Sequence, residues 1–193
     1  MYMFMLNSST LEKSDLSSLK RCYVGGQTMP VATMAAVEKE FKVPLIELWG
    51  MTEIAGLGAT FPLFGPNKHG SIGCAIPYCE LKIVDVDDCS KQMNAGEVGE
   101  LMVKGPITMM GYFGDEEKTR ETLEPDGWLH SGDLAKIDKD GCVYIVDRKK
   151  DMIITGGYNV YPAEIERVLA ANSKVALAAV GKQNDELKGE IAK

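Results

Sequence analysis

The stretch ELWGMTEI, residues 47–54, has the pattern of an apolar strand that stops at a glycine. Its end presents Thr52 beside Glu53, so a hydroxyl lies next to a carboxylate at a strand terminus. The hydroxyl can donate to a phosphate oxygen, and the carboxylate is the hard oxygen ligand that Mg²⁺ prefers. The stretch therefore predicts a phosphate and magnesium site, although a strand followed by an ordinary polar loop has the same pattern.

The residues before this stretch complete a strand–helix–strand unit. A short strand is expected over residues 19–24, ending at Gly25 and Gly26. Two glycines there let another group approach the backbone closely, or simply make a tight turn. A strand over residues 45–49 follows an intervening helix. Such a unit predicts parallel strands with ligands bound at their C-terminal ends.

The intervening helix has clear start and stop signals. Thr28 is the expected N-cap, Pro30 lies in the first turn, and Pro44 follows the end near residue 42. Four residues are expected to face the core: Ala32, Ala35, Ala36 and Phe41.

The pattern changes after residues 61–73, which are rich in Gly and Pro and mark a junction. Short alternating strands are expected over residues 81–86, 99–105, 134–137 and 142–146, with one helix over 116–123. Lys139-Asp140-Gly141 is a hairpin signal between the last two strands. These features predict a small antiparallel β-barrel or sandwich.

A third pattern begins with the charged link 148–151. It continues with a strand over 152–155, a glycine turn, a helix over 162–171 and a strand over 175–180, with Ile165, Val168 and Leu169 facing inward. We expect an α/β plus β fold in three parts. These are a partial parallel-sheet subdomain (1–64), a β-barrel-like subdomain (65–147), and a hinge with an incomplete α+β C-terminal domain (148–193).

Composition narrows the class of protein. The 193 residues are 45% hydrophobic and 25% charged, with a formal net charge of −7. An acidic chain of this kind argues against nucleic acid as the main partner. No stretch is long and apolar enough for a signal peptide or a membrane span, so we expect a cytoplasmic protein.

The five cysteines have no C-x-x-C spacing, and the chain has only two histidines, His69 and His130. This pattern argues against a zinc site or a disulfide framework and favours free thiols in a reducing compartment.

Four motifs occur in order: VGGQ (24–27), WGMTE (49–53), WLHSGDL (128–134) and DRKKDMIITGGYNVYPAEIE (147–166). A fifth, GELMVKGPITMMGY, spans residues 99–112. With these motifs the chain resembles the middle and C-terminal part of the adenylate-forming superfamily, which includes acyl-CoA synthetases, 4-coumarate:CoA ligases, luciferases and peptide-synthetase adenylation domains. The resemblance implies ATP, Mg²⁺ and coenzyme A as cofactor and co-substrates.

The resemblance assigns a role to each motif residue. Trp49 would stack on adenine, or else be an ordinary core tryptophan. Thr52 would contact phosphate and Glu53 would hold Mg²⁺, as the two catalytic residues. Asp133 would accept the ribose hydroxyls and Arg148 would join it there, although a solvated acid and a solvated basic link are the plain alternatives. The remaining nucleotide-binding positions are Gly25, Gly26, Gln27, Gly50 and Met51.

The last motif, residues 147–166, is similar to the segment that joins the mobile small domain to the rest of the enzyme in this family. Lys150 aligns with the hinge residue about which the small domain turns between two half-reactions. Gly156 and Gly157 match the glycine turn beside the pantetheine tunnel of CoA. We assign His130 no catalytic role.

Two family elements are missing from the sequence: the Ser/Thr/Gly-rich phosphate loop and the lysine near the end of the small domain. We therefore expect a segment of a longer acyl-CoA synthetase that makes acyl-AMP from a carboxylic acid, expected to be a fatty acid, and transfers the acyl group to CoA. The segment alone is expected to be inactive. The alternatives are a non-catalytic nucleotide-binding fragment, and a luciferase-like or carrier-protein-loading enzyme.

Overall fold

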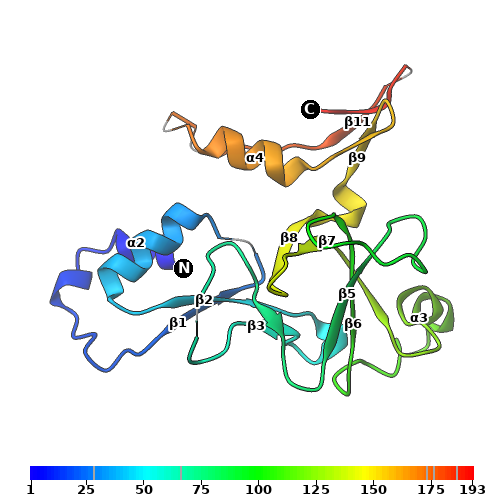
Figure 1. Ribbon diagram of the computed structural model, residues 1–193. Helices are drawn as coiled ribbons and strands as arrows, with labels where there is room; N and C mark the ends of the chain where they lie inside the picture. The colour runs from blue at the N-terminus through cyan, green and yellow to red at the C-terminus, as the bar shows by residue number, and fades with distance from the viewer. Residues whose placement is uncertain (28, 66, 173, 176, 186) are drawn as a thin grey trace.

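The computed structural model describes residues 1–27, 29–65, 67–172, 174–175, 177–185 and 187–193. Three four-stranded sheets follow one another along the chain, each with one or more helices (Figure 1). The helices are α1 (Tyr2–Leu6), α2 (Val31–Phe41), α3 (Glu116–Thr122) and α4 (Pro162–Ala170), with 3-10 turns η1 (Leu11–Lys13), η2 (Thr52–Ile54) and η3 (Lys149–Asp151).

The first sheet contains the parallel pair that the sequence predicts. Its order is β1 (Cys22–Gly25), β2 (Leu45–Trp49), β3 (Ala59–Thr60) and β4 (Cys74–Ala75). β1 and β2 are parallel, with Gly25 beside Leu48, and the other pairs are antiparallel. Because β4 lies in this sheet, the sheet extends past residue 64, where a domain boundary is expected.

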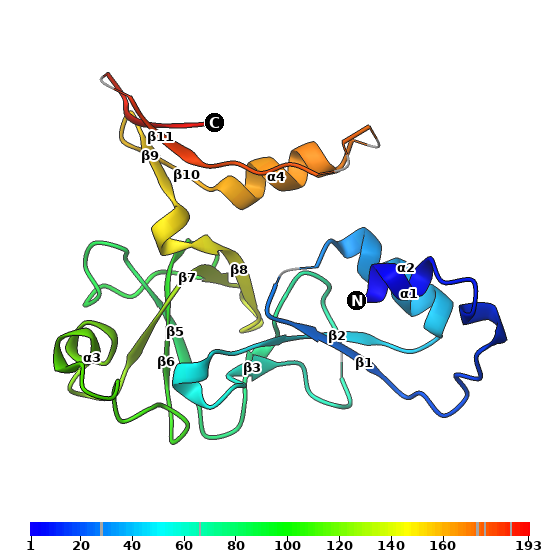
Figure 2. The same cartoon turned by 180° about the vertical axis from the view of Figure 1, so that it is seen from behind.

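The face of α2 differs from the expectation. α2 buries Met34, Val37 and Phe41, whereas Ala32, Ala35 and Ala36 are exposed. The buried positions follow helical spacing and use larger side chains, which remove more apolar area from water than alanines do. Pro30 is the N-cap rather than a first-turn residue, and the expected cap Thr28 lies outside the described residues. Tyr2 of α1 packs on Phe41, with ring centroids 6.2 Å apart. Figure 2 shows α1 beside α2.

The second sheet is antiparallel, with the order β5 (Glu80–Val84), β6 (Gly99–Lys104), β7 (Leu129–Ile137) and β8 (Val143–Arg148). The predicted hairpin turn joins β7 to β8. In the described part of the chain this sheet is open, so the expected barrel is corrected to an open four-stranded sheet. Its residues share one core with the first sheet, since Trp49 and Ile54 pack in the same cluster as Leu101 and Leu129.

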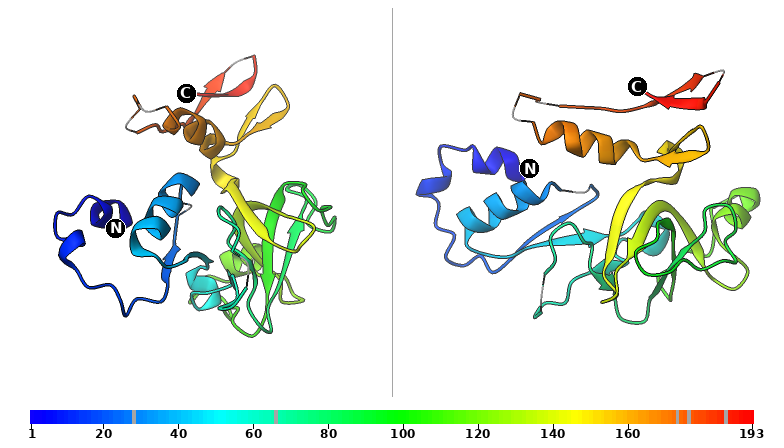
Figure 3. Two further views of the ribbon diagram at one scale, coloured as in Figure 1. Left: turned by 60° about the vertical axis from the view of Figure 1, so that its left-hand side comes forward. Right: turned by 45° about the horizontal axis from the view of Figure 1, so that its top comes forward.

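The third sheet has the order β10 (Tyr158–Val160), β9 (Ile153–Thr155), β12 (Gly189–Ala192) and β11 (Lys182–Asp185). Figure 3 shows this part joined to the rest of the chain through β8 and η3. Two expectations fail here. The described residues of 175–180 form no strand, and Val168 and Leu169 are 66% and 44% exposed rather than buried.

No helix in the described ranges is long and apolar enough to cross a membrane.

Candidate functional site

The C-terminal ends of β1 and β2 lie side by side and are built around glycines. A Cβ at Gly25 would lie 3.0 Å from the Leu48 carbonyl oxygen, and Gly26 has a φ of +83°. A Cβ at Gly50 would lie 1.5 Å from the carbonyl oxygen of Gly56, which excludes any side chain there. Close backbone contacts thus favour glycine at positions 25 and 50, and the positive φ favours it at position 26. Gln27 is exposed directly after them.

Three predicted residues from three strands meet at one carboxylate. Trp49 Nε1 donates a hydrogen bond of 2.8 Å to Asp133 Oδ2. Arg148 Nε lies 2.9 Å from Asp133 Oδ1, and Asp133 and Arg148 are direct partners in the β7–β8 register. The first sheet supplies Trp49 and the second sheet supplies the other two, so the group forms only where these two sheets meet.

Burial and charge oppose each other at Asp133, which is 7% exposed. Burial raises the pKa of the Asp133 carboxyl, while the Trp49 hydrogen bond and the Arg148 charge lower it, and the net shift is upward. Each carboxylate oxygen has one protein donor and a second acceptor position, so both oxygens can still accept a hydroxyl. This arrangement suits a vicinal diol.

Trp49 is largely enclosed by protein. It is 7% exposed, and a Cβ added at Gly58 would come within 2.6 Å of its ring. Its indole therefore acts here as a core side chain with one polar contact to Asp133. Stacking on adenine stays a prediction.

Glu53 has a partner that the sequence analysis did not assign. Tyr112 Oη donates a hydrogen bond of 2.8 Å to Glu53 Oε1, and the Met109 amide donates one of 2.8 Å to the Glu53 carbonyl oxygen. Burial, followed by the contact with Glu53, raises the pKa of Tyr112. The loop after β6 therefore fixes the Glu53 carboxylate and leaves Oε2 free of that bond. Thr52 beside it is exposed, and Met51 packs against the shared core.

A buried carboxylate in β6 was also missed. Glu100, 3% exposed, accepts a hydrogen bond of 2.8 Å from Lys149 Nζ and lies 3.2 Å from His130 Nδ1. Burial acts to raise the pKa of Glu100, but the His130 and Lys149 contacts outweigh it and hold the pKa below its usual value. The only feature of the sequence that could have pointed to Glu100 is its place near the start of the motif GELMVKGPITMMGY. This network anchors η3, the segment that contains Lys150.

The remaining predicted residues lie apart from this group. Lys150 is exposed in η3, between β8 and β9. Gly156 and Gly157 form the β9–β10 turn with φ values of +57° and +84°, a backbone region that favours glycine. Figure 1 shows β9 leading away from the antiparallel sheet toward that turn.

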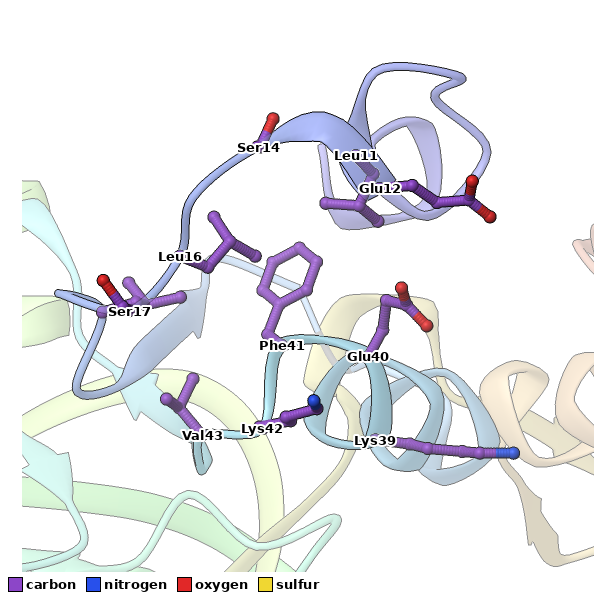
Figure 4. Close-up of a pocket in the computed structure, with 11 residues that line it drawn as sticks. Leu11, Glu12, Ser14, Leu16, Ser17, Lys39, Glu40, Phe41, Lys42 and Val43 are labelled. Atoms are coloured by element: carbon purple, nitrogen blue, oxygen red, sulfur yellow. The ribbon is translucent and has the colours of Figure 1, made fainter.

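Two cavities lie elsewhere. One of about 500 Å³ separates the segment around Leu11 and Leu16 from the end of α2 at Phe41 (Figure 4). The other, of about 360 Å³, is lined by α4 and β10. Neither cavity is lined by a predicted site residue. The candidate site is therefore located by the contacts among Trp49, Asp133 and Arg148, and not by cavity volume.

Comparison with known proteins identifies the family of this arrangement. The family model described as AMP-binding enzyme matches residues 1–113. A long-chain-fatty-acid–CoA ligase from Salmonella typhimurium is 45% identical over 181 residues, which cover 92% of this chain and 31% of the ligase. Luciferin 4-monooxygenase from Photinus pyralis is 37% identical over 192 residues, covering 99% of this chain and 34% of that enzyme.

Solved structures agree with the sequence relatives. ATP-bound MatB from Rhodopseudomonas palustris superposes with a TM-score of 0.91 at 32% identity, covering 99% of this chain and 38% of MatB. The chain thus spans about a third of the length of the relatives it matches, and it has the adenylate-forming enzyme fold. Because the family model matches more than half of its residues, the chain belongs to the AMP-binding enzyme family.

Proposed function

We propose that this chain contributes the adenosine side of the active site in an ATP-dependent acid–CoA ligase. The observation on which the proposal rests is the meeting of Trp49, Asp133 and Arg148 at one carboxylate. In this role Asp133 accepts the two ribose hydroxyls, and Arg148 adds donors beside it from a planar fork. The relatives named as fatty-acid–CoA ligases support a fatty acid as the carboxylic substrate.

The proposed reaction has two steps. A carboxylate oxygen of the acid attacks the α-phosphorus of ATP, which forms acyl-AMP and releases pyrophosphate. The thiol of coenzyme A then attacks the acyl carbon, so that a thioester forms, the thiol proton is lost and AMP leaves. The chain's own residues would act by positioning and by charge stabilisation.

The residues near Glu53 fit a magnesium ion. Mg²⁺ is commonly held by one or two carboxylates together with substrate phosphates and water. Glu53 offers one carboxylate, oriented by Tyr112, with the exposed Thr52 hydroxyl next to it for a phosphate oxygen. When bound, the ion would neutralise phosphate charge. The roles of Gly25, Gly26, Gln27, Gly50 and Met51 at the nucleotide remain part of the proposal.

We also propose the three-part division into residues 1–64, 65–147 and 148–193, with Lys150 as the hinge and with Gly156 and Gly157 beside the CoA arm. Lys149 of η3 is hydrogen-bonded to Glu100 of the second sheet. This bond fixes the start of the link between the two parts and supports a hinge at the neighbouring Lys150. A cytoplasmic setting belongs to the same proposal.

A nucleotide titration of the chain tests the ribose site. Wild type is compared with Asp133→Asn, which keeps the shape of the side chain and removes its charge. Asp140→Asn is the matched control, since Asp140 is an exposed acid of the β7–β8 turn. We expect AMP affinity to fall for Asp133→Asn and to be unchanged for Asp140→Asn. Equal affinity of all three proteins would remove Asp133 from the ribose site.

A second candidate is a nucleotide-binding module without catalysis, since the group of Trp49, Asp133 and Arg148 would serve binding alone. ATP–pyrophosphate exchange by a longer protein that contains this sequence separates the two, because the 193-residue chain alone is expected to be inactive in either case. Exchange by that longer protein above its Glu53→Ala control would exclude the module. For a luciferase-like alternative, supported by the Photinus relative, product analysis of a longer protein containing this sequence decides between a CoA ester and light emission.

A further inference from the structure

Three potential metal ligands of different chemistry meet outside the nucleotide site. They are Cys89, Glu124 and His130, and their ligand atoms all lie within 4.8 Å of one another. His130 Nε2 is 3.0 Å from Glu124 Oε1, and Cys89 Sγ is 3.8 Å from the same oxygen. We propose that these side chains bind a divalent transition metal ion of borderline softness, with Zn²⁺ as the best match.

The spacing of the ligand atoms suits a tetrahedral ion. With bonds of about 2.3 Å to sulfur and about 2.0–2.1 Å to nitrogen and oxygen, neighbouring ligands of tetrahedral zinc are about 3.3–3.6 Å apart. The observed separations of 3.0 Å and 3.8 Å bracket that range. Rotation of the exposed Cys89 side chain, whose sulfur lies within 4.8 Å of both other ligand atoms, would complete the geometry. Three protein ligands leave the fourth position to water.

The donor set selects the kind of metal. A thiolate and an imidazole favour zinc and its neighbours, whereas magnesium and calcium prefer oxygen ligands alone. The site is therefore chemically distinct from Glu53, whose hard oxygen suits magnesium. Cys89 is exposed and gives an ion a path from solvent, while Glu124 and His130 are half-buried.

His130 is held in the orientation that a metal ligand needs. Its Nδ1 lies 3.2 Å from Glu100 Oε2, so this nitrogen can donate to a buried carboxylate while Nε2 faces Cys89 and Glu124. Metal-bound histidines almost always have such an outer partner, which fixes the tautomer and ring orientation. Lys149 in turn holds Glu100 at 2.8 Å. The contact of His130 with the buried Glu100 is the independent observation that favours a bound ion.

Three separate segments supply the ligands. Cys89 lies in the loop after β5, Glu124 follows α3, and His130 belongs to β7. Their separations in the sequence match no local zinc motif, which is why the spacing of cysteines and histidines argued against such a site. An ion here would cross-link a loop and the end of α3 to the central strand of the antiparallel sheet.

The alternative to a bound metal ion is a proton on His130. A charged His130 could bridge Glu100 and Glu124 by itself, with Cys89 as a bystander. Only the ion requires the Cys89 thiolate, so cysteine variants separate the two.

Metal titration of the reduced, chelator-treated chain tests the proposal. Zn²⁺ binding is measured by calorimetry, and Co²⁺ is used as an absorbing probe, because a thiolate ligand gives a near-ultraviolet charge-transfer band. We expect one equivalent per chain and a thiolate band in wild type. Cys89→Ser should abolish the band and weaken Zn²⁺ binding at least about tenfold, and Glu100→Gln should weaken it about 10–100-fold.

The chain offers matched controls for both soft ligands. Cys79→Ser removes a half-buried thiol outside the cluster, and His69→Asn removes a histidine that lies 2.9 Å from Glu38 in a comparable pair. Both should bind Zn²⁺ as wild type does, whereas His130→Asn should not. Circular dichroism checks that each variant is folded, and Zn²⁺ should slow alkylation of Cys89 specifically.

Two results would overturn the proposal. One is equal Zn²⁺ affinity in wild type and folded Cys89→Ser. The other is a Co²⁺ complex of wild type without a thiolate band. Either result assigns the cluster to a protonated histidine between two carboxylates.

Discussion

Trp49 Nε1 donates a 2.8 Å hydrogen bond to Asp133 Oδ2 and thereby joins two strands that are 84 residues apart in the sequence. The contact links the end of β2 in the first sheet to the middle of β7 in the second sheet. Both side chains are buried, so the bond forms away from competing water. It sets the position of the carboxylate that we propose for the ribose.

Replacing Trp49 by Phe tests this contact. The variant keeps an aromatic ring in the core but leaves Asp133 Oδ2 without its donor. A buried acceptor left unsatisfied costs about 1–3 kcal/mol, so the free energy of unfolding should fall by about that amount. Because the Trp49 hydrogen bond lowers the pKa of Asp133, that pKa should rise further in the variant. Urea unfolding and carboxyl NMR titration measure the two effects.

Trp128→Phe is the control for that experiment. Trp128 is half-buried, and its ring lies under Lys82 Nζ at 4.2 Å without a buried carboxylate partner. A loss of stability equal to that of Trp49→Phe would mean that indole volume, and not the hydrogen bond, explains the effect.

The Tyr112–Glu53 bond predicts a change in magnesium dependence. Tyr112→Phe removes the 2.8 Å bond and frees the Glu53 carboxylate to rotate. A net hydrogen bond contributes about 0.5–1.5 kcal/mol, so the magnesium concentration for half-maximal nucleotide binding should rise about 2–12-fold. Tyr144→Phe, which loses a bond to Asp138 instead, should leave it unchanged. Identical magnesium curves for wild type and Tyr112→Phe would contradict the role of Glu53.

His130 predicts a fall in stability as the pH rises above 6.5. A hydrogen bond with Glu100 raises the pKa of His130 above its ordinary 6.5, against the opposing effect of burial. A raised histidine pKa contributes stability that is fully present below pH 6.5 and is lost as pH rises through the higher folded value. His130→Gln should therefore flatten the stability curve above pH 6.5, measured by urea unfolding with a chelator present. An unchanged slope would show that the imidazolium does not stabilise the fold.

Asp138 predicts a loss of stability in acid. A hydrogen bond from Lys68 lowers the pKa of Asp138 from 3.8 to about 2. Its oxygens also accept the Asp140 and Cys142 amides within the β7–β8 turn, at 2.9 Å each. A lowered carboxyl pKa gives stability that is present above pH 3.8 and lost as pH falls through about 2.

Asp138→Asn should thus be less stable than wild type at pH 7, and the difference should shrink on acidification. Thermal unfolding at several pH values measures this. Asp140→Asn provides the comparison, because it removes a Lys68 contact of 2.7 Å but leaves the turn amides paired. A constant difference between Asp138→Asn and wild type from pH 7 to pH 2 would contradict the assignment.

Local patterns determined much of the fold. The apolar run 45–49, the glycines after each strand and the proline near the helix start predict a parallel strand–helix–strand unit, and β1, α2 and β2 form it. The hairpin at Asp140-Gly141 is confirmed for the same reason, since turn chemistry acts between neighbours in the chain. The order of the motifs also predicted the family.

Other features depend on which surfaces meet. The sequence gives α2 alanines and larger apolar residues on different faces, and only packing against Tyr2 and Leu45 selects Met34, Val37 and Phe41. β7 begins at Leu129, five residues before the expected start, because His130–Asp133 looks like a loop but pairs with β6 across an irregular register.

The sequence by itself determined the strand–helix–strand unit, the β7–β8 hairpin and the residues with the right chemistry for a nucleotide. Only the tertiary structure decided that Trp49, Asp133 and Arg148 share one carboxylate, that Tyr112 holds Glu53, and that Cys89, Glu124 and His130 face one another. The physical reason is the distance along the chain over which each kind of interaction acts. Strand and turn preferences act over a few residues, whereas these contacts join segments brought together by burial of a core shared between two sheets.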